Sequence, residues 1–304
     1  MARCPKLRMN GLILLDKPEG VTSFAALGRV KRVLKTRKVG HTGTLDPFAT
    51  GLLVVLAGTF TRLADHITAL DKRYEARFRF GVTTDTLDRD GSVTGEGPIP
   101  DRSDVERAMT GLVGPIDQIP PAYSAIRVNG ERAHRLAREG RPPVLASRSV
   151  TIHSCTLREW EPPDAVVEVH CSKGAYIRSL VRDVAAAAGT VGLVQELRRT
   201  SVGAFSVEDA VSTEAFDAER HIVGGKAVMA AIDGARSITV HEAAVLRVLN
   251  GGRVTAADVV GDGDMTQGMY GLFAETGSLL ALAEFDGDRF RWSCVLEQRG
   301  QSAG

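Results

Sequence analysis

The sequence lacks the long apolar runs and paired cysteines that mark membrane proteins and secreted disulfide-rich domains. None of its apolar stretches approaches the ~20 residues of a transmembrane helix. The apolar run near the amino terminus is only GLILL, and it ends in Asp16 and Lys17, which is not the form of a signal peptide. The cysteines show no CxxC spacing and no histidine at metal-ligand spacing; they are Cys4, Cys155, Cys171 and Cys294. We therefore expect a cytoplasmic protein with no metal site.

Cofactor-binding motifs are also missing. There is no P-loop, no GxGxxG after a strand, no HExxH and no GxSxG. The run DTLDRDG at 85–91 faintly resembles a calcium loop, but it lacks the Asp-x-Asp-x-Asp-Gly register and the distal glutamate, so we interpret it as a turn. We expect no cofactor, and any chemistry has to come from side chains alone.

The net charge of +1 hides an uneven distribution along the 304 residues. The first 46 residues carry ten Lys and Arg against three acidic residues, with RVKRVLKTRK at 29–38 as the densest run. Residues 234–304 carry six Arg against nine acidic residues, a net charge of -3. The basic run is either a solvated helix face or a surface for phosphates, and its charge alone does not decide between them.

The order of periodic segments predicts an α+β protein rather than a regular βαβ alternation. We expect a helix over 24–35, capped by Thr22 or Ser23, and a long helix after Gly174. A proline-bounded, arginine-rich stretch at about 123–148 is typical of an insertion that stands off the core. Short β-type segments after about 233 predict a separate small module, which gives domains 1–232 and 233–304. Strands are expected at 11–17, at 72–82 and twice within 149–171, and residues 52–57 are expected to form a buried apolar run.

The stretch GHTGTLDPFATG at 40–51 places one acidic residue, Asp46, between a leucine and a proline. Pro47 restricts the local backbone, and the flanking glycines allow a close approach to a ligand. Asp46 is either a turn residue or a carboxylate held out for chemistry.

Several segments in fixed order decide this question. Together they closely resemble the TruB-type family of bacterial tRNA pseudouridine-55 synthases, over about residues 10–209. The Asp46 loop is the most specific of them. The others are DKP (16–18), KRYEA (72–76), QIPPAYSA (118–125), GAYIRSL (174–180) and LRRTSVG (197–203).

The resemblance implies a catalytic fold and three catalytic residues. The fold is a pseudouridine-synthase-like mixed, largely antiparallel sheet with flanking helices and the insertion, followed by a small β-barrel-like module of the PUA type. Asp46 is the implied nucleophile, attacking either C6 of the base or C1′ of the sugar. Arg178 pairs with it and keeps it ionised in a water-poor pocket. Tyr74 offers a face for base stacking and a hydroxyl that can move a proton.

Four further residues are implied to bind the substrate. Tyr176 and Leu197 match positions that line the uridine pocket, although Leu197 also fits a plain core leucine. His41 matches a histidine that packs at or beside the place left by the flipped-out nucleotide, and a loop histidine bonded to the backbone is the alternative. Lys17 either contacts phosphate or supports the Asp46 loop.

The resemblance implies tRNA as the substrate, gripped at its T-stem loop by the insertion. No obligate protein partner is expected, and a monomer is the default because the sequence has no large apolar repeat. The acidic C-terminal segment departs from what an RNA-binding module should carry, so its contact with RNA is open. Two other function classes remain: a non-catalytic RNA-binding or tRNA-folding protein, and a hydrolase with an aspartyl nucleophile. The hydrolase would need a second group to activate water, and the matched segments offer only His41.

Overall fold

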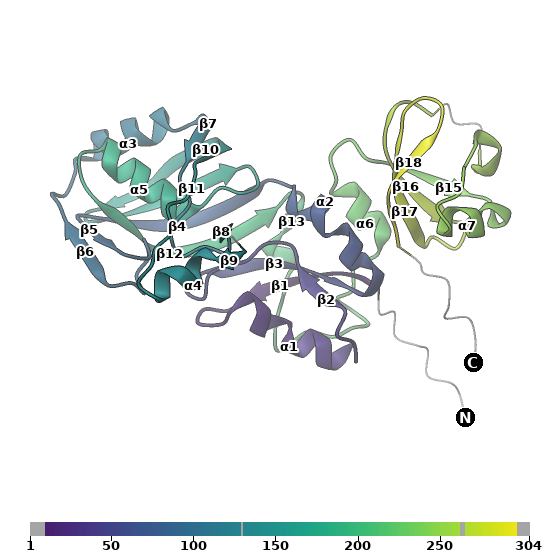
Figure 1. Ribbon diagram of the computed structural model, residues 1–304, viewed down its shortest axis with the longest axis horizontal. Helices are drawn as coiled ribbons and strands as arrows, with labels where there is room; N and C mark the ends of the chain where they lie inside the picture. The colour runs from purple at the N-terminus through teal and green to yellow at the C-terminus, as the bar shows by residue number, and fades with distance from the viewer. Residues whose placement is uncertain (1–9, 129, 262–264, 297–304) are drawn as a thin grey trace. The chain divides into compact units, whose positions relative to one another are not determined.

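The computed structural model describes residues 10–128, 130–261 and 265–296, which form two compact units (Figure 1). The first unit comprises the chain up to Asp46, residues 51–70, and the chain from Val202 onward. The second unit comprises Pro47–Thr50 and Asp71–Ser201. None of the helices in these ranges has the length and apolarity needed to cross a membrane.

The first unit is built around β1, which pairs antiparallel with β3 and parallel with β14, while β2 lies along β3. Its elements are β1 (Gly11–Lys17), α1 (Ser23–Val33), β2 (Val39–His41), β3 (Thr50–Ala57), η1 (Gly58–Leu63), α2 (Ala64–Thr68), β13 (Phe205–Ser206), η2 (Val207–Asp209), β14 (Val211–Ser212), α6 (Gly225–Ala230), β15 (Arg236–Val240), α7 (Glu242–Leu249), η3 (Ala256–Asp258), β16 (Gly268–Ala274), β17 (Leu279–Phe285) and β18 (Phe290–Val295).

Strands β1 and β3 are apolar on both faces, and each face builds a different core. Because side chains alternate along a strand, Ile13 and Leu15 face one way and Leu12 and Leu14 the other. The first pair packs with Leu53, Val55 and Ala57 of β3 against α1, through Ala26, Leu27, Val30 and Leu34. The second pair packs with Leu52, Val54 and Leu56 against α2, α6 and strands near the carboxyl terminus. The two strands are therefore a shared wall between two cores.

Helix α1 begins where the sequence predicts and ends earlier. Thr22 is its N-cap, with its hydroxyl oxygen accepting from the Ala25 N–H at 3.1 Å. The helix ends at Val33 rather than at residue 35, and Lys35 takes a left-handed φ of 50°. The basic run 29–38 is thus partly helix and partly turn, and the predicted end of the helix at residue 35 is wrong by two residues.

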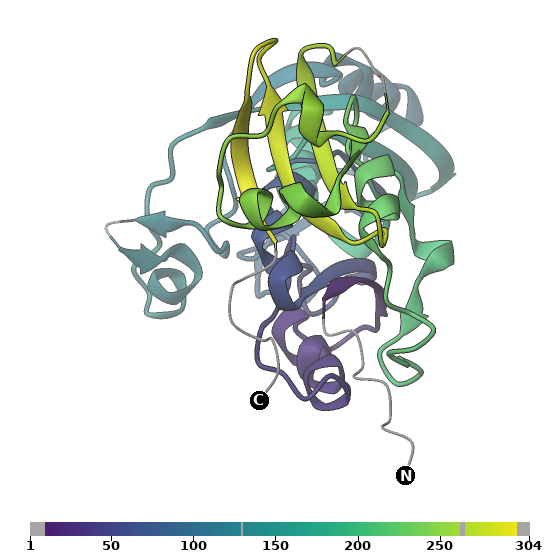
Figure 2. The same cartoon turned by 90° about the vertical axis from the view of Figure 1, so that its right-hand side faces the viewer.

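The predicted small β module is confirmed as a four-stranded sheet of order β15-β16-β17-β18 (Figure 2). β15 is parallel to β16, and the other neighbours are antiparallel. Over residues 233–261 and 265–296, no strand pairing closes the sheet into a barrel. One face forms its own core with α7. The other face contributes Phe273, Leu279 and Leu282 to the core under β1 and β3. The domain boundary at 232/233 stays a prediction.

The second unit contains a largely antiparallel sheet with the strand order β12-β4-β11-β10-β7. Helices α3 and α5 pack against each other, α3 also against β10 and α5 against β4 (Figure 1). The elements are β4 (Lys72–Phe80), β5 (Val82–Thr84), β6 (Val93–Glu96), α3 (Arg102–Gly111), β7 (Gly114–Gln118), β8 (Arg127–Val128), β9 (Glu131–Arg132), α4 (Ala133–Arg138), β10 (Arg148–Glu161), β11 (Asp164–Cys171), α5 (Ile177–Ala187) and β12 (Gly192–Val202).

The predicted insertion is a small substructure of its own. It consists of the β8–β9 hairpin and α4, which stand away from the large sheet of the second unit in Figure 2. Its anchor is a short ladder in which Ala133 N–H donates to the Ile126 carbonyl at 2.7 Å and His134 N–H to the Ser124 carbonyl at 3.1 Å. Four arginines, Arg127, Arg132, Arg135 and Arg138, are exposed on it and line one shallow pocket.

The contact between α6 and β17 predicts a local sensitivity at Gly225. A Cβ there would lie 2.4 Å from Leu279 Cβ, whereas a Cβ at Gly224 meets nothing within 4 Å. We expect Gly225→Ala to lower the free energy of unfolding by about 1–3 kcal/mol through overpacking. Urea denaturation checks this, with Gly224→Ala as the matched control. Equal effects of the two variants would contradict the close packing of α6 on the sheet.

Candidate active site

The loop that carries Asp46 is fixed by a reciprocal pair of hydrogen bonds one residue earlier. Leu45 N–H donates to Ser23 Oγ at 2.8 Å, and the Ser23 hydroxyl donates to the Leu45 carbonyl at 2.9 Å. Ser23 and Leu45 are each 3% exposed, so both bonds are sheltered from water. Ser23 is the first residue of α1, and the helix therefore holds the backbone next to Asp46.

The rest of the loop is tied to the strand that follows it. Thr42 N–H donates to the Val54 carbonyl at 3.0 Å, and the Thr68 hydroxyl donates to the Thr42 carbonyl at 3.2 Å. Gly51 has φ of 98°, a conformation that side chains with a Cβ rarely adopt. Asp46 itself is half-buried between the buried Leu45 and the exposed Pro47. The sequence prediction of a loop shaped by glycine around one carboxylate fits this backbone.

Lys17 and His41 lie in the same unit as Asp46. Lys17 is 0% exposed, and its ammonium donates to the carbonyls of Pro18 at 2.8 Å and Val21 at 2.7 Å. An ammonium this deeply buried is not placed to contact an RNA phosphate, so its burial favours the structural alternative. His41 ends β2, opposite Val55, and is half-buried.

Arg178 is in the second unit, in the first turn of α5, and is only 4% exposed. Its Nη1 donates to the Thr86 carbonyl at 2.8 Å and its Nη2 to the Tyr123 carbonyl at 2.9 Å. Asp88 Oδ2 lies 3.5 Å from Nη1. The guanidinium is therefore buried and oriented by backbone carbonyls rather than lying on the surface.

Asp88 lies beside Arg178, and sequence reasoning did not single it out. It is 6% exposed, and its Oδ1 accepts from the Thr86 hydroxyl at 2.6 Å and from the Asp90 N–H at 3.1 Å. The run 85–91 had been interpreted only as a turn, and it does form one, with Leu87 at φ of 61°. Only the fold brings this turn to Arg178, so no local signal identifies it.

Tyr176 is the N-cap residue of α5 and is locked in place by a neighbouring amide. Its N–H donates to Gln118 Oε1 at 2.8 Å, and Gln118 Nε2 donates to its carbonyl at 3.2 Å. The Arg148 guanidinium lies 4.7 Å from the ring centroid. One ring face of Tyr176 thus carries a cation.

Tyr74 and Leu197 lie on two strands of the second unit. Tyr74 is half-buried on β4, opposite Val169 of β11. Leu197 on β12 is 8% exposed, in keeping with either a pocket wall or a core leucine. Lys72, two residues before Tyr74, was also missed: burial, followed by the charge of Arg199, lowers its pKa to about 8. It is the one lysine of the KRYEA segment.

The seven predicted site residues are divided between the units. Asp46, Lys17 and His41 belong to the first, and Tyr74, Tyr176, Arg178 and Leu197 to the second. Within the first unit the structure presents a carboxylate on a fixed loop. Within the second it presents a buried cation beside an aromatic residue.

Two family models match the chain. One is described as the N-terminal domain of TruB family pseudouridylate synthases and matches residues 31–177. The other is described as the tRNA pseudouridylate synthase B C-terminal domain and matches residues 178–230.

Curated relatives match most of the chain. A tRNA pseudouridine synthase B of Thermobifida fusca is 40% identical over 285 residues, covering 90% of this chain and 94% of the relative. One of Mycobacterium sp. strain KMS is 40% identical over 295 residues, covering 94% and 96%. One of Nitrosococcus oceani is 45% identical over 208 residues, 68% of each chain.

Solved structures agree on the fold. A chain in a Cbf5-Nop10-Gar1 complex superposes with a TM-score of 0.70 at 22% identity, covering 98% of this chain and 88% of its own length. A chain in the archaeal box H/ACA sRNP Nop10-Cbf5 complex gives 0.68 at 21% identity, covering 98% and 90%. The predicted pseudouridine-synthase-like fold is confirmed.

The Ser23–Leu45 pair predicts that Ser23→Ala destabilises the protein. The substitution leaves a buried N–H and a buried carbonyl without their partner, so we expect the free energy of unfolding to fall by about 1–3 kcal/mol. Urea denaturation measures this. Ser237→Ala, at an exposed strand position, is the control and should change stability by less than about 0.5 kcal/mol. If Ser23→Ala is as neutral as the control, Ser23 does not hold the loop.

Proposed function

The chain belongs to the TruB family of tRNA pseudouridine synthases, and we propose that it isomerises uridine to pseudouridine at position 55 in the T-loop of tRNA. The observation that carries this proposal is the Asp46 loop, which combines the matched family segment with a backbone fixed by buried hydrogen bonds. No observation on the described residues favours the non-catalytic RNA-binding protein or the aspartyl hydrolase over it.

The reaction balances without a redox partner or added water. The bond between N1 of uracil and C1′ of ribose breaks, the base turns, and a bond from C5 to C1′ forms. The C5 hydrogen leaves as a proton, and N1 gains one. The enzyme must hold the detached base, supply a nucleophile that also leaves, and move protons. A carboxylate, a cation and a tyrosine meet these needs.

Asp46 is the nucleophile in this proposal, and Arg178 is the cation that keeps it ionised. The assignment comes from the family resemblance. Two features support it: Asp46 stands on a fixed loop, and the Arg178 guanidinium is preoriented by the carbonyls of Thr86 and Tyr123. A preorganised charge in a water-poor site stabilises a developing opposite charge without having to reorganise during the reaction.

The remaining site residues bind and handle the base. Tyr74 stacks on the uracil and moves a proton, and Tyr176 and Leu197 line the pocket. His41 packs at or beside the vacated position in the T-loop. Lys17 acts on the loop rather than on phosphate, in keeping with its burial and its bonds to Pro18 and Val21.

The insertion supplies much of the grip on RNA. Extracting a base from its stack costs a few kcal/mol, which phosphate contacts and stacking must offset. Four exposed arginines around one shallow pocket fit the phosphate backbone of a stem. Two acids partly neutralise one of them, since Arg135 pairs with Glu131 and Glu139. The net charge of this surface still favours an anion.

The C-terminal sheet is a weaker candidate for RNA contact. Arg247 pairs with Asp258 at 3.0 Å, and Arg291 pairs with Asp286 at 3.2 Å. These arginines are engaged within the module, in keeping with its net negative charge. The PUA-type assignment stays a prediction. A cytoplasmic location and a monomeric enzyme without an obligate protein partner also stay predictions. Size-exclusion chromatography with light scattering tests whether the protein is a monomer.

Replacing the nucleophile tests the proposal most directly. We expect Asp46→Asn to reduce tritium release from C5-labelled uridine in an unmodified tRNA transcript by roughly 10⁴-fold or more, because an amide is a poor nucleophile. Affinity for the tRNA, measured by filter binding, should stay within a few-fold. Asp65→Asn, at an exposed position of α2, is the control and should release tritium at the wild-type rate.

The outcomes separate the function classes. Wild-type protein that binds the tRNA without releasing tritium would leave only an RNA-binding role. Wild-type turnover that survives Asp46→Asn would show that another residue is the nucleophile.

Arg178 gives a second, independent prediction. Arg178→Lys keeps the charge but cannot reproduce the two bonds from separate guanidinium nitrogens to Thr86 and Tyr123. We expect kcat to fall by at least ~10²-fold with KM changed little, since the loss falls on the transition state. Steady-state tritium release measures both constants. The control is Arg182→Lys, one turn along α5, whose arginine donates to the Ile119 carbonyl at 3.0 Å. Equal kcat values for the two variants would refute the role of Arg178.

A further inference from the structure

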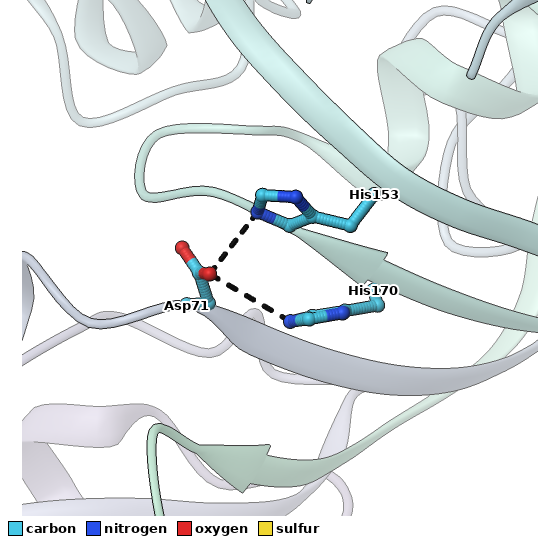
Figure 3. A group of neighbouring side chains, drawn as sticks. All are labelled: Asp71, His153 and His170. Carbon is cyan, nitrogen blue, oxygen red and sulfur yellow. Dashed lines mark ion pairs between the residues drawn. The ribbon is translucent and has the colours of Figure 1, made fainter. Parts of the chain in front are cut away.

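A group of metal-ligand side chains lies in the second unit: Asp71, His153 and His170 (Figure 3). Asp71 directly precedes β4, His153 is on β10 and His170 is on β11. Asp71 Oδ2 is 3.0 Å from His153 Nε2 and 3.7 Å from His170 Nε2. One ligand atom from each residue lies within 4.8 Å of the other two. Among the described residues no other set of three or more His, Cys, Asp or Glu meets this condition.

Strand register explains why three residues so distant in sequence meet here. β11 pairs with β4 so that His170 lies opposite Arg73 and Cys171 opposite Lys72, which brings Asp71 to the end of the ladder. The β10–β11 pairing shifts between Ile152 and Ser154. His153 is the extra residue of that bulge, and a bulge re-aims a side chain out of the regular alternation. The two imidazole rings consequently lie 4.5 Å apart between centroids.

Ion pairing of Asp71 with both histidines would require two imidazolium ions side by side. Here both imidazoles approach the same carboxylate oxygen. Two imidazolium ions in contact would repel each other. A neutral imidazole is the form that coordinates metal ions.

We propose that Asp71, His153 and His170 form a binding site for a divalent transition-metal ion of the zinc class, with a water in the fourth position. Zinc bonds to nitrogen and oxygen of ~2.0–2.1 Å in tetrahedral geometry set neighbouring ligand atoms roughly 3.3–3.4 Å apart. The observed separations of 3.0 and 3.7 Å bracket that value. Two imidazoles with one carboxylate suit zinc, whereas calcium and magnesium prefer oxygen ligands alone.

The surroundings allow an ion to enter. The side chains of Asp71, His153 and His170 are 43%, 36% and 23% exposed, so no part of the fold has to open. Cys171 follows His170 but is not a ligand in this proposal, because it is 1% exposed.

A bound ion would tie the chain just before β4 to the β10–β11 hairpin. Tyr74 lies three residues beyond Asp71, so the tie fixes the start of the strand that carries it. The site stands apart from the pseudouridine chemistry and does not depend on it. It also revises the expectation of no metal site, which was drawn from sequence spacing. The ligands are 82 and 17 residues apart, and no motif spans such gaps.

The test is a titration of the full-length protein, stripped of metal by chelation, with Zn²⁺ in the presence of a competing indicator dye. We expect one Zn²⁺ per chain. His153→Ala and His170→Ala should each weaken binding at least ~10-fold, since even partners outside the coordination sphere change affinity by that much. The matched control is His241→Ala. That histidine lies 3.4 Å from Glu275 without a second histidine beside it, so its loss should leave zinc affinity unchanged.

A second readout keeps the test decisive if an alanine variant folds poorly. Zn²⁺ should raise the Tm of the wild type and of His241→Ala, and should leave the Tm of the near-isosteric Asp71→Asn variant less changed. The proposal is overturned if the wild type binds no Zn²⁺ at micromolar concentrations. It is equally overturned if the site variants bind Zn²⁺ as the wild type does, or if His241→Ala loses affinity to the same extent.

Discussion

The hydrogen bonds between Ser23 and Leu45 are the constraint on which the position of Asp46 depends. Leaving a buried backbone group unpaired costs on the order of 1–3 kcal/mol. While α1 keeps its position, loop conformations that break the bonds to Ser23 are therefore disfavoured. The place of α1 is set in turn by Ala26, Leu27 and Val30, which pack on β1 and β3. Packing in the hydrophobic core thus fixes the position of the proposed nucleophile through a single serine, Ser23. Thr22, by capping the helix, leaves that serine available for the loop.

The same two strands also explain why the C-terminal sheet is part of the body of the first unit. A strand that is apolar on both faces needs a cover on each. α1 covers one face of β1 and β3. On the other face, Phe273, Leu279 and Leu282 share a core with Leu12 and Leu14. Removing the sheet would expose one face of β1 and β3, the two strands that support α1 and the Asp46 loop on their other face. The module can therefore matter to the catalytic half through packing, whatever its contact with RNA.

Sequence reasoning succeeded where a local pattern determines the structure. The alternation of KRYEARFRF and of the two segments after residue 148 gave β4, β10 and β11 close to their bounds. It failed where a contact depends on tertiary register. Asp88 reaches Arg178 only because its turn packs on α5, and His153 reaches His170 only through a bulge in β10. Ser23 was assigned as a possible helix cap because no periodic signal shows that its hydroxyl faces Leu45 instead.

The arrangement around Arg178 also explains why that position needs an arginine. A guanidinium has five N–H donors in a rigid plane, whereas an ammonium has three on a flexible stem. Nη1 and Nη2 each give a bond to a backbone carbonyl, and Asp88 lies beside Nη1. The carbonyls carry no net charge, so they fix the plane of the cation without cancelling it, and Asp88 balances part of its charge in the buried site. A cation held in this way does not have to be reoriented before it acts on a carboxylate. A lysine would have to reach both carbonyls from a single nitrogen on a flexible stem, so it would not have the fixed plane of the guanidinium.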